Sequence, residues 1–371
     1  WEERSRMSNI PKLRFPEFKG EWEEKKLGEC LTLLYGKDWK DKSSTKKLYP
    51  VLGTGGVISY IDEFIYDKPC VLIGRKGSIN NPVFIDKPFW TVDTQFYSEI
   101  HEGYSPKFLY YIFCTENWSK HDESTGVPSL SAKNVENTHK HIPSYSEQQK
   151  IADFLSNVDS IITAETKILN TLQKKKKALM QKLFTQQLRF KSDDGTDFPE
   201  WEEKKLGDVC SYIGGGTPSK KVKEYWNGNI NWASVKDITG KYLYETQDKI
   251  SQLGADSSAT NICEPDSLLL ITRMSPGKTV ITKCITAINQ DLKIVKSYIN
   301  VEFLHLLFQS IQTKIDEKTS GTTVKGISIE GLNQIDIRLP CKAEQQKIAD
   351  CLSSMDSLIQ TQQKVVTTWQ Q

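Results

Sequence analysis

A chain of 371 residues is about twice as long as one hydrophobic core usually needs, so its length predicts two domains or one large domain. The composition is 37% hydrophobic and 26% charged, with a mean hydropathy of -0.49. These values exclude collagen, a wholly disordered chain and a typical membrane protein. The 49 Lys and Arg residues are nearly balanced by 47 Asp and Glu residues, for a formal net charge of +2, so any strongly basic surface must be local.

The beginning of the chain carries no signal for export. Residues 1–20 lack the hydrophobic region of a signal peptide, and no apolar run reaches the roughly 18 to 20 residues that span a bilayer. We therefore expect a cytoplasmic protein with an amino-terminal extension at 1–20. For residues 1–6, before Met7, two interpretations stay open: a remnant of expression, or the authentic start of a processed chain. The shortest separation among the eight cysteines, Cys341 to Cys351, excludes a CxxC zinc site, and we expect reduced, mostly buried thiols.

Two pairs of nearly identical segments divide the chain into two copies of one unit. WEEKKLG occurs at 22–28 and again at 201–207, a separation of 179 residues. SEQQKIADFLSNVDSII at 146–162 returns as AEQQKIADCLSSMDSLI at 343–359, a separation of 197 residues. Because 197 exceeds 179 by 18, the second copy holds 18 more residues between its markers. Each copy is thus ordered as an opening motif, a variable globular segment and a long periodic segment.

The globular segments share a pattern of apolar strands, one helix, a Gly-Ser-Thr-rich loop and a last short strand. In the first copy we predict strands at 70–73, 82–86 and 90–100 and a helix at 106–120. In the second copy we predict strands at 267–271, 279–283 and 287–296 and a helix at 301–318. The pattern predicts an α+β fold for each copy, with a twisted sheet braced by one helix.

The periodic segments predict two long helices that pack against each other. Apolar residues recur with a period of 3.5, interrupted by Glu165, Lys176 and Gln362, and neither segment contains Pro or Gly. At about 1.5 Å per residue, the first helix is on the order of 60 Å long. The predicted coiled-coil seam consists of Ile151, Leu155, Val158, Ile162, Leu169, Leu172, Leu179, Leu183, Ile348, Leu352, Met355 and Ile359.

Together these features resemble the specificity subunit of bacterial type I restriction–modification systems. In the second copy, GGGTPSKKVKEYWNGNINWASVKDI at 214–238 looks like the opening signature of that family, and SGTTVKGISIEGLNQIDIRLP at 320–340 looks like its closing signature. The EQQKIAD helices look like its spacer regions. The first copy departs from the opening signature, with LYGKDWKDKSSTKKLYPVLGTGG in its place, which is expected if the two variable segments read different half-sites.

The resemblance implies two pseudo-symmetric target-recognition domains of mixed α/β structure, at 21–145 and 191–342. They are separated by two spacer helices, at 146–190 and 343–371, packed as an antiparallel coiled coil. Each domain is expected to read one half of an asymmetric bipartite site in double-stranded DNA, while the helices set the gap. The implied partners are two modification subunits that bind S-adenosylmethionine and methylate adenine, and restriction subunits that use ATP and Mg²⁺. This chain is then non-catalytic and holds no cofactor or metal itself.

Candidate DNA contacts of the first copy lie in polar loops and at one strand. Lysine can neutralise phosphates, Arg commonly reads guanine, and Asn and Gln can pair with adenine. The alternatives are a solvated lysine-rich loop and, for arginine, a structural salt bridge. The candidates are Lys37, Lys40, Lys42, Lys46, Lys47, Arg75, Lys76, Ser78, Asn80, Asn81, Gln95, Ser129, Ser131 and Lys133.

Candidate contacts of the second copy follow the same logic. We expect Arg75 and Arg273 to occupy equivalent positions after a strand, Asn289 and Gln290 to lie within a strand, and Trp226 to pack beneath its loop. The candidates are Thr217, Ser219, Lys220, Lys221, Lys223, Tyr225, Asn227, Asn229, Arg273, Ser275, Lys278, Asn289, Gln290, Thr322, Thr323 and Lys325.

Catalytic interpretations find little support in the sequence. NNPVF at 80–84 only approximates the NPPY-type loop of adenine methyltransferases, and SPGKT at 275–279 lacks the first glycine of a phosphate-binding loop. The lysine run 174–177 is typical of the solvated face of a coiled coil, and His139 and His141 have no neighbouring ligand set for a metal. Two other hypotheses stay open: a coiled-coil adaptor with two protein-binding domains, and a methyltransferase or nuclease in its own right.

Overall fold

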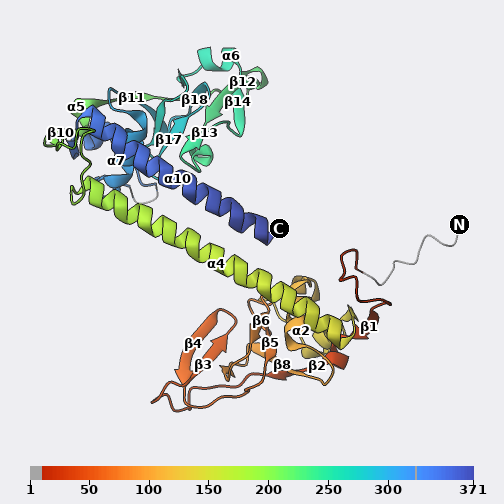
Figure 1. Cartoon of the computed structure of the whole chain (residues 1–371). Helices are drawn as coiled ribbons and strands as arrows, with labels where there is room; N and C mark the ends of the chain where they lie inside the picture. The colour runs from red at the N-terminus through yellow and green to blue at the C-terminus, as the bar shows by residue number, and fades with distance from the viewer. Residues whose placement is uncertain (1–10, 322–323) are drawn as a thin grey trace. The chain divides into compact units, whose positions relative to one another are not determined.

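A computed structural model describes residues 11–321 and 324–371 of the chain (Figure 1). It divides into two compact units, Trp1–Thr163 and Ala164–Gln371. Helix α4 (Tyr145–Phe184) contributes residues to both units. Each unit combines helices and strands, as the α+β prediction requires.

The first unit contains three sheets instead of the single one predicted. A two-stranded sheet pairs the opening motif with the last strand of the copy, and two larger sheets lie between them in sequence. Their strand orders are β1-β9, β2-β8-β5-β6 and β4-β3-β7. The elements are β1 (Glu23–Lys26), α1 (Leu27–Cys30), β2 (Leu31–Tyr35), β3 (Tyr49–Gly53), β4 (Gly56–Ile61), β5 (Cys70–Gly74), β6 (Val83–Ile85), β7 (Trp90–Thr91), β8 (Gln95–Ile100), α2 (Pro106–Cys114), η1 (Trp118–His121), α3 (Ala132–Glu136) and β9 (His139–Ile142).

The second unit repeats this plan with additional elements. Its strand orders are β10-β20, β11-β19-β16-β17-β13 and β14-β12-β18-β15. The strands are β10 (Glu202–Lys205), β11 (Cys210–Gly214), β12 (Trp226–Ala233), β13 (Tyr242–Leu243), β14 (Asp248–Ile250), β15 (Asn261–Cys263), β16 (Leu268–Ile271), β17 (Thr279–Thr282), β18 (Thr286–Ile288), β19 (Leu292–Ser297) and β20 (Asp336–Leu339). The helices are α5 (Leu206–Val209), η2 (Lys223–Tyr225), η3 (Val235–Asp237), α6 (Gln252–Asp256), α7 (Val301–Ser310), α8 (Gln312–Glu317), α9 (Ile329–Asn333) and α10 (Lys342–Gln370).

Several predicted elements are shorter than expected because polar turns interrupt them. The helix predicted at 106–120 is α2 followed by η1, and the helix predicted at 301–318 is α7 followed by α8. The strand predicted at 90–100 is split into β7 and β8, and the one at 287–296 is replaced by β18 and β19. Between β18 and β19 the Asn289 side chain accepts a hydrogen bond from the Asp291 backbone N–H at 3.0 Å, an arrangement that favours a turn.

Helix α2 shows how the local sequence fixes these elements. Ser105 caps the helix by accepting a hydrogen bond from the Phe108 N–H at 3.3 Å, and Pro106 suits the first helical position. Phe108, Leu109 and Phe113 are buried on one face, where they join the core with β5 and β8. Helix α7 plays the same part in the second unit, with its apolar residues buried in the core that also contains β16 and β17.

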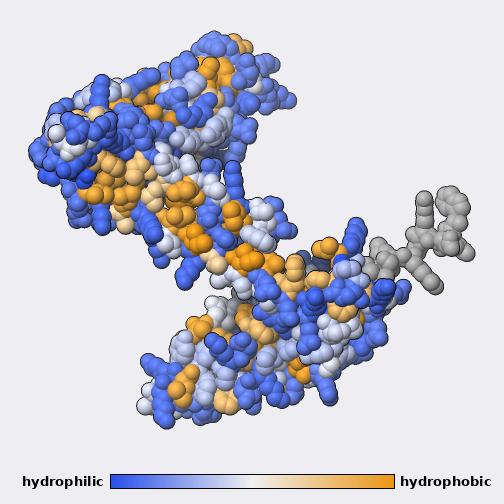
Figure 2. Space-filling model, in the orientation of Figure 1, coloured by the Kyte–Doolittle hydropathy of each residue, from blue (hydrophilic) through white to orange (hydrophobic). Residues whose placement is uncertain are grey.

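Helices α4 and α10 pack in opposite directions within the second unit. Lys176 of α4 forms an ion pair with Asp356 of α10, and Gln362 of α10 donates to the Glu165 carboxylate at 2.5 Å. The polar residues that interrupt both seams therefore contact the other helix. The predicted seam residues are all buried or half-buried. Figure 2 shows apolar side chains (orange) along the helices, among hydrophilic ones.

Some seam residues also belong to the cores of the globular segments. Ile151 packs against the core of the first unit. Leu179, Leu183, Ile348 and Leu352 join the core of the second unit, together with α7. The ends of the long helices are thus integral parts of the two cores.

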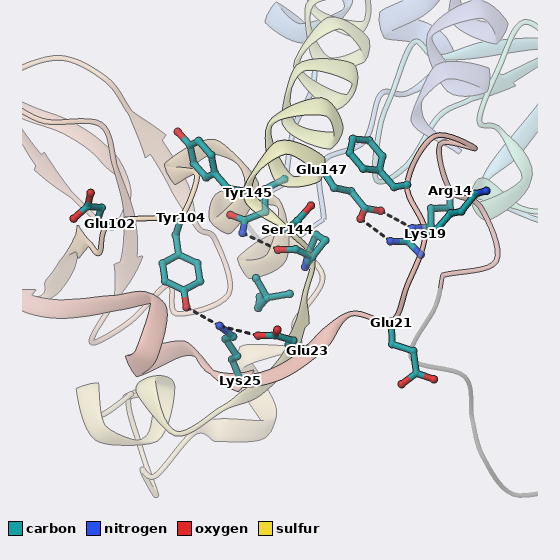
Figure 3. A pocket seen from close by; sticks show the side chains of 15 residues that line it. Arg14, Lys19, Glu21, Glu23, Lys25, Glu102, Tyr104, Ser144, Tyr145 and Glu147 are labelled. Carbon is teal, nitrogen blue, oxygen red and sulfur yellow. Dashed lines mark hydrogen bonds and ion pairs between the residues drawn. The ribbon is translucent and has the colours of Figure 1, made fainter.

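A buried carboxylate fastens the start of α4 to the first globular segment. Glu147 accepts hydrogen bonds from Arg14 Nε and Nη2, both at 2.7 Å, and from Trp22 Nε1 at 3.2 Å. Figure 3 shows the Arg14–Glu147 pair of this clamp beside a pocket of about 400 Å³. Arg14 comes from the extension predicted at 1–20, so the described part of that segment is tied to the helix at Arg14.

The second copy repeats the clamp with equivalent residues. Glu344 at the start of α10 accepts hydrogen bonds from Arg189 Nε at 3.2 Å, from its Nη2 at 2.9 Å, and from Trp201 Nε1 at 3.0 Å. Each arginine lies in the short sequence LRF, at 13–15 and 188–190. The structural repeat therefore includes this tripeptide, which precedes the longer markers in each copy.

Candidate nucleic-acid interface

The loops after β5 and β16 occupy equivalent places in the two copies. An isolated bridge joins Lys76 to Ser129 in the first copy, and a second bridge joins Arg273 to Gly326. Both residues of the second bridge lie 197 residues after those of the first. The structure thus equates Arg273 with Lys76, and the predicted equivalence with Arg75 is wrong by one residue. The sequence comparison had aligned Arg75 with Arg273 because both are arginine, whereas the bridges align Arg273 with Lys76.

The two arginines of these loops, Arg75 and Arg273, differ in their contacts within the protein and in the exposure of their side chains. Arg75 Nε donates to the Asp93 carbonyl at 2.7 Å and its guanidinium lies 5.8 Å from the centre of the Tyr35 ring. Its side chain is 24% exposed. Arg273 contacts Asp291 at 3.4 Å, and its side chain is 56% exposed. Arg273 is therefore the freer of the two to reach a ligand.

One residue of these loops was missed by the sequence analysis. Gly77 has a φ of 86° and Met274, 197 residues later, a φ of 73°. Their N–H groups donate to the carbonyls of Pro128 and Lys325, both at 2.9 Å. A left-handed backbone conformation is costly for methionine. The Met274 side chain is 62% exposed, so its burial does not offset that cost. Only the 197-residue separation from Gly77 pointed to this position in the sequence.

Two predicted contacts of the first copy serve the fold. Gln95 is buried and its side-chain oxygen accepts a hydrogen bond from Thr91 Oγ1 at 2.9 Å. Asn80 Oδ1 accepts a hydrogen bond from the Trp118 N–H at 2.7 Å. Gln95 therefore has no surface to offer to DNA, and Asn80 is committed to the loop before η1. Lys76, Ser78 and Asn81 are exposed.

The candidates in the Gly-Ser-Thr-rich loops are divided between structural and exposed positions. Ser131 caps α3 by accepting a hydrogen bond from the Asn134 N–H at 3.2 Å. Thr322 and Thr323 lie outside the described residues. In these loops Ser129 and Ser131 are half-buried, and Lys133 and Lys325 are exposed. In the loop after β16, Ser275 is half-buried and Lys278 is exposed.

The lysine-rich loop of the first copy is organised around one carboxylate. Asp62 accepts three backbone N–H groups of this loop at 2.8–3.1 Å and the Ser43 hydroxyl at 2.7 Å. The bond from Ser43 and those from the backbone lower the pKa of Asp62. Lys42 is half-buried and pairs with Glu63 at 3.1 Å. The exposed lysines are Lys37, Lys40, Lys46 and Lys47.

The corresponding loop of the second copy packs on a tryptophan side chain. Trp226 Nε1 donates to the Ser219 carbonyl at 3.1 Å, and its ring packs edge-on against Trp232 with centroids 5.2 Å apart. Trp226 therefore packs beneath the loop, as predicted. Tyr225 is half-buried, and the exposed candidates are Thr217, Ser219, Lys220, Lys221, Lys223, Asn227 and Asn229.

A buried tryptophan makes the same hydrogen bond in both copies. Trp90 Nε1 donates to the Lys37 carbonyl at 2.9 Å, and Trp232 Nε1 donates to the Gly216 carbonyl at 3.1 Å. Lys37 and Gly216 are separated by the 179 residues that separate the opening motifs. The two indoles thus support equivalent points of the polar loops.

The two tryptophans nevertheless come from different strands. In the first copy Val51 of β3 faces Trp90 of β7, and in the second copy Trp232 of β12 faces Ala287 of β18. The large side chain has moved across the strand pair to its neighbour. Trp90 and Trp232 fill a similar volume and make the same indole hydrogen bond, but they lie at different positions of the repeat. A comparison of the two copies by sequence therefore does not match one tryptophan with the other.

Each tryptophan lines a hollow rimmed by predicted contact residues. The hollow of the first copy is about 500 Å³ and that of the second about 580 Å³. The first is lined by Lys37, Asp38, Lys40, Asp41, Lys42 and Trp90. The second is lined by Thr217, Lys220, Trp232, Ser234, Lys236, Asp248, Asn289 and Gln290. Three lysines and two aspartates line the first hollow, whereas the second combines two lysines and one aspartate with two amides and two hydroxyls.

The amides of the second hollow are oriented by their neighbours. Asn289 is buried and donates to the Asp291 carboxylate at 3.3 Å, so its side chain stabilises the turn. Gln290 is exposed, and its oxygen accepts a hydrogen bond from the Thr217 hydroxyl at 2.6 Å. Both residues lie in the loop between β18 and β19, so their predicted location within a strand is wrong. A loop leaves Gln290 free to point outward.

Other kinds of site find no support among the described residues. Within 11–321 and 324–371, no group of three or more His, Cys, Asp and Glu side chains is placed to hold a metal ion. In the same part of the chain, no helix is both long and apolar enough to cross a membrane. The eight cysteines are free; four are buried, three are half-buried and Cys114 is exposed.

The sequence matches the family described as "Type I restriction modification DNA specificity domain" twice, at residues 19–174 and 199–368. The chain belongs to this family. The two matches coincide with the two copies of the repeat and confirm the resemblance drawn from the motifs.

Curated relatives carry the same family name. The MjaIX specificity subunit of Methanocaldococcus jannaschii is 31% identical over 189 residues, 49% of this chain and 44% of that protein. The EcoR124I/EcoR124II specificity subunit of Escherichia coli is 29% identical over 232 residues, 60% of this chain and 54% of that protein. The chain thus spans about half the length of these two specificity subunits. The MjaVIII specificity subunit of M. jannaschii is 26% identical over 385 residues, 95% of this chain and 89% of that protein.

A solved structure shows the fold of the specificity family for the full length of the chain. The S subunit of a type I restriction–modification system from M. genitalium aligns with a TM-score of 0.66 and 15% identity. The alignment covers 97% of this chain and 96% of that one. The fold with two mixed domains and two long helices is therefore the one predicted.

Proposed function

We propose that this member of the specificity family is the non-catalytic subunit that gives a type I restriction–modification complex its DNA sequence specificity. Each globular segment, hereafter called a recognition domain, reads one half of an asymmetric bipartite site in double-stranded DNA. The long helices set the gap between the half-sites.

The observation that carries this proposal is a constant framework with variable side chains. Backbone bridges hold the loops after β5 and β16 in the same register, and an indole supports the same carbonyl in both copies. The exposed side chains differ: Lys76 stands where the second copy has Arg273, and Lys37 stands where it has Gly216. Two domains that recognise different base sequences need such an arrangement. Side chains that contact base edges determine which sequence is bound, whereas the framework only holds those side chains in place.

Side-chain chemistry supports two kinds of DNA contact. The exposed lysines of the loop that surrounds Asp62 suit phosphate contacts, which fix position without reading sequence. Arg273 and Gln290 suit base edges, because guanidinium and carboxamide groups pair with guanine and adenine. A net charge of only +2 is compatible with these local basic surfaces.

The helices support a role in spacing and assembly. Their antiparallel packing in the second unit is pinned by Lys176–Asp356 and Glu165–Gln362, and polar pairs in a seam specify its register. Ile168 and Leu358 expose about half of their surface, which suits contact with other subunits. We propose two adenine-modification subunits and restriction subunits as partners, with S-adenosylmethionine, ATP and Mg²⁺ bound by those partners.

Exchange of one domain tests the proposal directly. The chain is co-expressed with its modification subunits, and methylated sites are mapped by sequencing. Replacing residues 29–142 with the corresponding segment of another family member changes one half-site and leaves the other half-site and the gap unchanged. The matched replacement of residues 208–339 changes only the other half-site.

Two outcomes contradict the proposal. If either exchange alters both half-sites, the domains do not read DNA independently. If the unmodified chain directs no methylation to a bipartite site, the adaptor hypothesis gains support. Purified chain with S-adenosylmethionine, Mg²⁺ and DNA but no other subunit serves as the control for intrinsic catalysis; methyl transfer in that reaction contradicts the non-catalytic assignment.

A further inference from the structure

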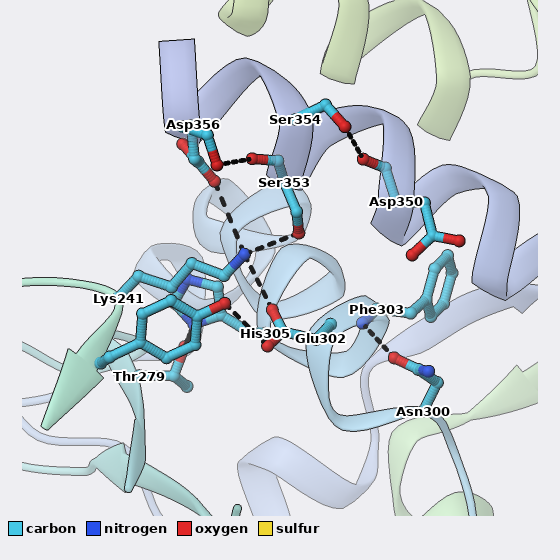
Figure 4. A network of polar contacts seen from close by, with 12 residues as sticks. Lys241, Thr279, Asn300, Glu302, Phe303, His305, Asp350, Ser353, Ser354 and Asp356 are labelled. Atoms are coloured by element: carbon cyan, nitrogen blue, oxygen red, sulfur yellow. Dashed lines mark hydrogen bonds and ion pairs between the residues drawn. The ribbon is translucent and has the colours of Figure 1, made fainter. Parts of the chain in front are cut away.

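Four charged side chains, three from helices α4, α7 and α10 and one from the loop before β13, meet in one cluster of the second unit. Figure 4 shows three of them, Lys241, Glu302 and Asp356. Lys241, just before β13, contacts Glu302 of α7 at 2.8 Å and Asp356 of α10 at 3.6 Å. Lys241 Nζ also donates to Ser353 Oγ at 2.8 Å. Asp356 in turn pairs with Lys176 of α4. We call these four charged residues, Lys176, Lys241, Glu302 and Asp356, the anchor cluster.

The anchor cluster is shielded from solvent, which strengthens its attractions. Its side chains are between 14% and 30% exposed. Burial alone lowers the pKa of Lys241, but the hydrogen bond and charge of Glu302 outweigh it and raise that pKa above its ordinary value. The ammonium therefore stays charged. Half-buried ion pairs with several partners are screened less by salt than single surface pairs.

The anchor cluster is a second attachment of the domain to α10. The first is the core around Ile348 and Leu352 together with the Glu344 clamp. Asp356 lies twelve residues beyond Glu344, or about 18 Å along the helix at 1.5 Å per residue. One attachment leaves a domain free to rock on a helix, whereas two attachments along the axis fix its angle.

The first copy anchors the same helix positions with different chemistry. Ser156 and Asp159 of α4 precede Ser353 and Asp356 of α10 by 197 residues. Tyr111 of α2 contacts both, at 3.3 Å from the Ser156 hydroxyl and 2.6 Å from the Asp159 carboxylate. A neutral phenol thus does in the first copy what the ammonium of Lys241 does in the second.

Lys241 also lies close in sequence to the predicted DNA surface. It follows the segment that contains Ser234 and Lys236, which line the hollow over Trp232. Its own carbonyl accepts a hydrogen bond from the Ile281 N–H at 2.9 Å, at the edge of the five-stranded sheet. A movement of Lys241 relative to α10 would therefore be passed to the edge of that sheet.

We propose that Lys241 is a positioning residue that fixes the gap length. Together with Glu302 of the second recognition domain, it locks that domain to Asp356 of α10, which in turn pairs with Lys176 of α4. The inference rests on the proposed function. It concerns the spacing of the two half-sites and leaves their base sequences to the loops.

Gap tolerance in the assembled methyltransferase tests this role. Lys241→Met removes the ammonium but keeps most of the stem, and Lys241→Arg keeps a charge. Wild-type enzyme, Lys241→Met, Lys241→Arg and the control Lys347→Met are assayed on DNAs with the same half-sites and gaps one base pair shorter, normal or longer. Lys347 lies on α10, as Asp356 does, but pairs with Asp193.

Lys241→Met is expected to reduce the preference for the normal gap by about tenfold, the size of a coupling of roughly 1.4 kcal/mol. Lys241→Arg restores most of the preference, and Lys347→Met leaves it unchanged. A Lys241→Met enzyme that keeps the wild-type gap preference overturns the proposal, and so does one that changes the bases recognised. Thermal unfolding checks the fold; if Lys241→Met is unfolded, Asp356→Asn is measured in its place and judged by the same two outcomes. Failure of the wild-type enzyme to methylate any bipartite site refutes the proposed function instead.

Discussion

Loss of the buried Glu344 carboxylate is expected to weaken the second unit strongly. Glu344 is fully buried and accepts three hydrogen bonds, two from Arg189 and one from Trp201. Glu344→Ala leaves the guanidinium and the indole N–H without this partner. Breaking a buried pair by removing one member costs about 3–5 kcal/mol. Arg189 keeps its bonds to the carbonyls of Phe198 and Pro199, so we expect the lower end, about 3 kcal/mol.

This free energy predicts a measurable shift in thermal unfolding. A domain of about 150–250 residues loses roughly 2–4 °C in Tm for each kcal/mol, so the transition of the second unit should fall by about 6–12 °C. Glu344→Gln keeps the shape but presents an amide nitrogen to a donor, and we expect a smaller loss of about 1–2 kcal/mol. Calorimetry of the purified chain follows the transitions of the two units separately.

The chain provides a matched control for this measurement. Glu200 contacts the same Arg189 at 3.6 Å, but its side chain is 91% exposed. An exposed pair contributes about 0–1 kcal/mol, so Glu200→Gln should leave the transition nearly unchanged. If Glu344→Ala costs no more than Glu200→Gln, the clamp does not hold α10 to its domain and the reasoning is refuted.

Three further outcomes are expected. Burial lowers the pKa of His305 from 6.5 to about 4, so the unfolded chain binds a proton that the folded chain refuses, and stability should fall by roughly 3 kcal/mol as the pH drops from 6.5 to 4. Urea unfolding across this range should show a smaller loss for His305→Asn; an unchanged pH dependence contradicts this reasoning. Met274→Gly should stabilise the second unit by about 1 kcal/mol by relieving a left-handed φ, whereas Gly77→Ala should destabilise the first; opposite signs in thermal unfolding would contradict the strain argument. Trp232→Phe removes the support of one hollow and should alter methylation at one half-site, Trp90→Phe at the other, and an effect of either on both would show that the hollows are not separate readers.

Long periodic segments and exact repeats were the reliable signals in the sequence. The spacer helices predicted at 146–190 and 343–371 are α4 at Tyr145–Phe184 and α10 at Lys342–Gln370, so the first ends six residues before its predicted end. Both could be recognised because their seams are long and free of Pro and Gly. The short strands were less well placed, because two- and three-residue strands such as β7 and β18 have too few positions to show a period. The polar seam residues gave no hint that Glu165 and Gln362 meet.

The candidate interface was harder to predict because side-chain types do not reveal register. Arg75 was matched with Arg273 by residue type, although the backbone bridges place Arg273 opposite Lys76. Gln95 is polar, yet it begins a strand whose first four residues are all buried. Trp90 and Trp232 perform one task from neighbouring strands. Each of these relations depends on pairing between distant segments, which no local pattern contains.

The pairing of β1 with β9 and of β10 with β20 has an evolutionary consequence. In both copies the strand that begins the domain, EEKK, is identical in sequence and lies beside the strand that ends it. A segment inserted between these strands starts and finishes at the same place, so its length is free; the second copy already holds 18 more residues than the first between its markers, because 197 exceeds 179 by that number. Genetic recombination within the flanking repeats would therefore transfer a complete reading module, in frame and with its strand partners intact, and a new DNA specificity could arise in one step.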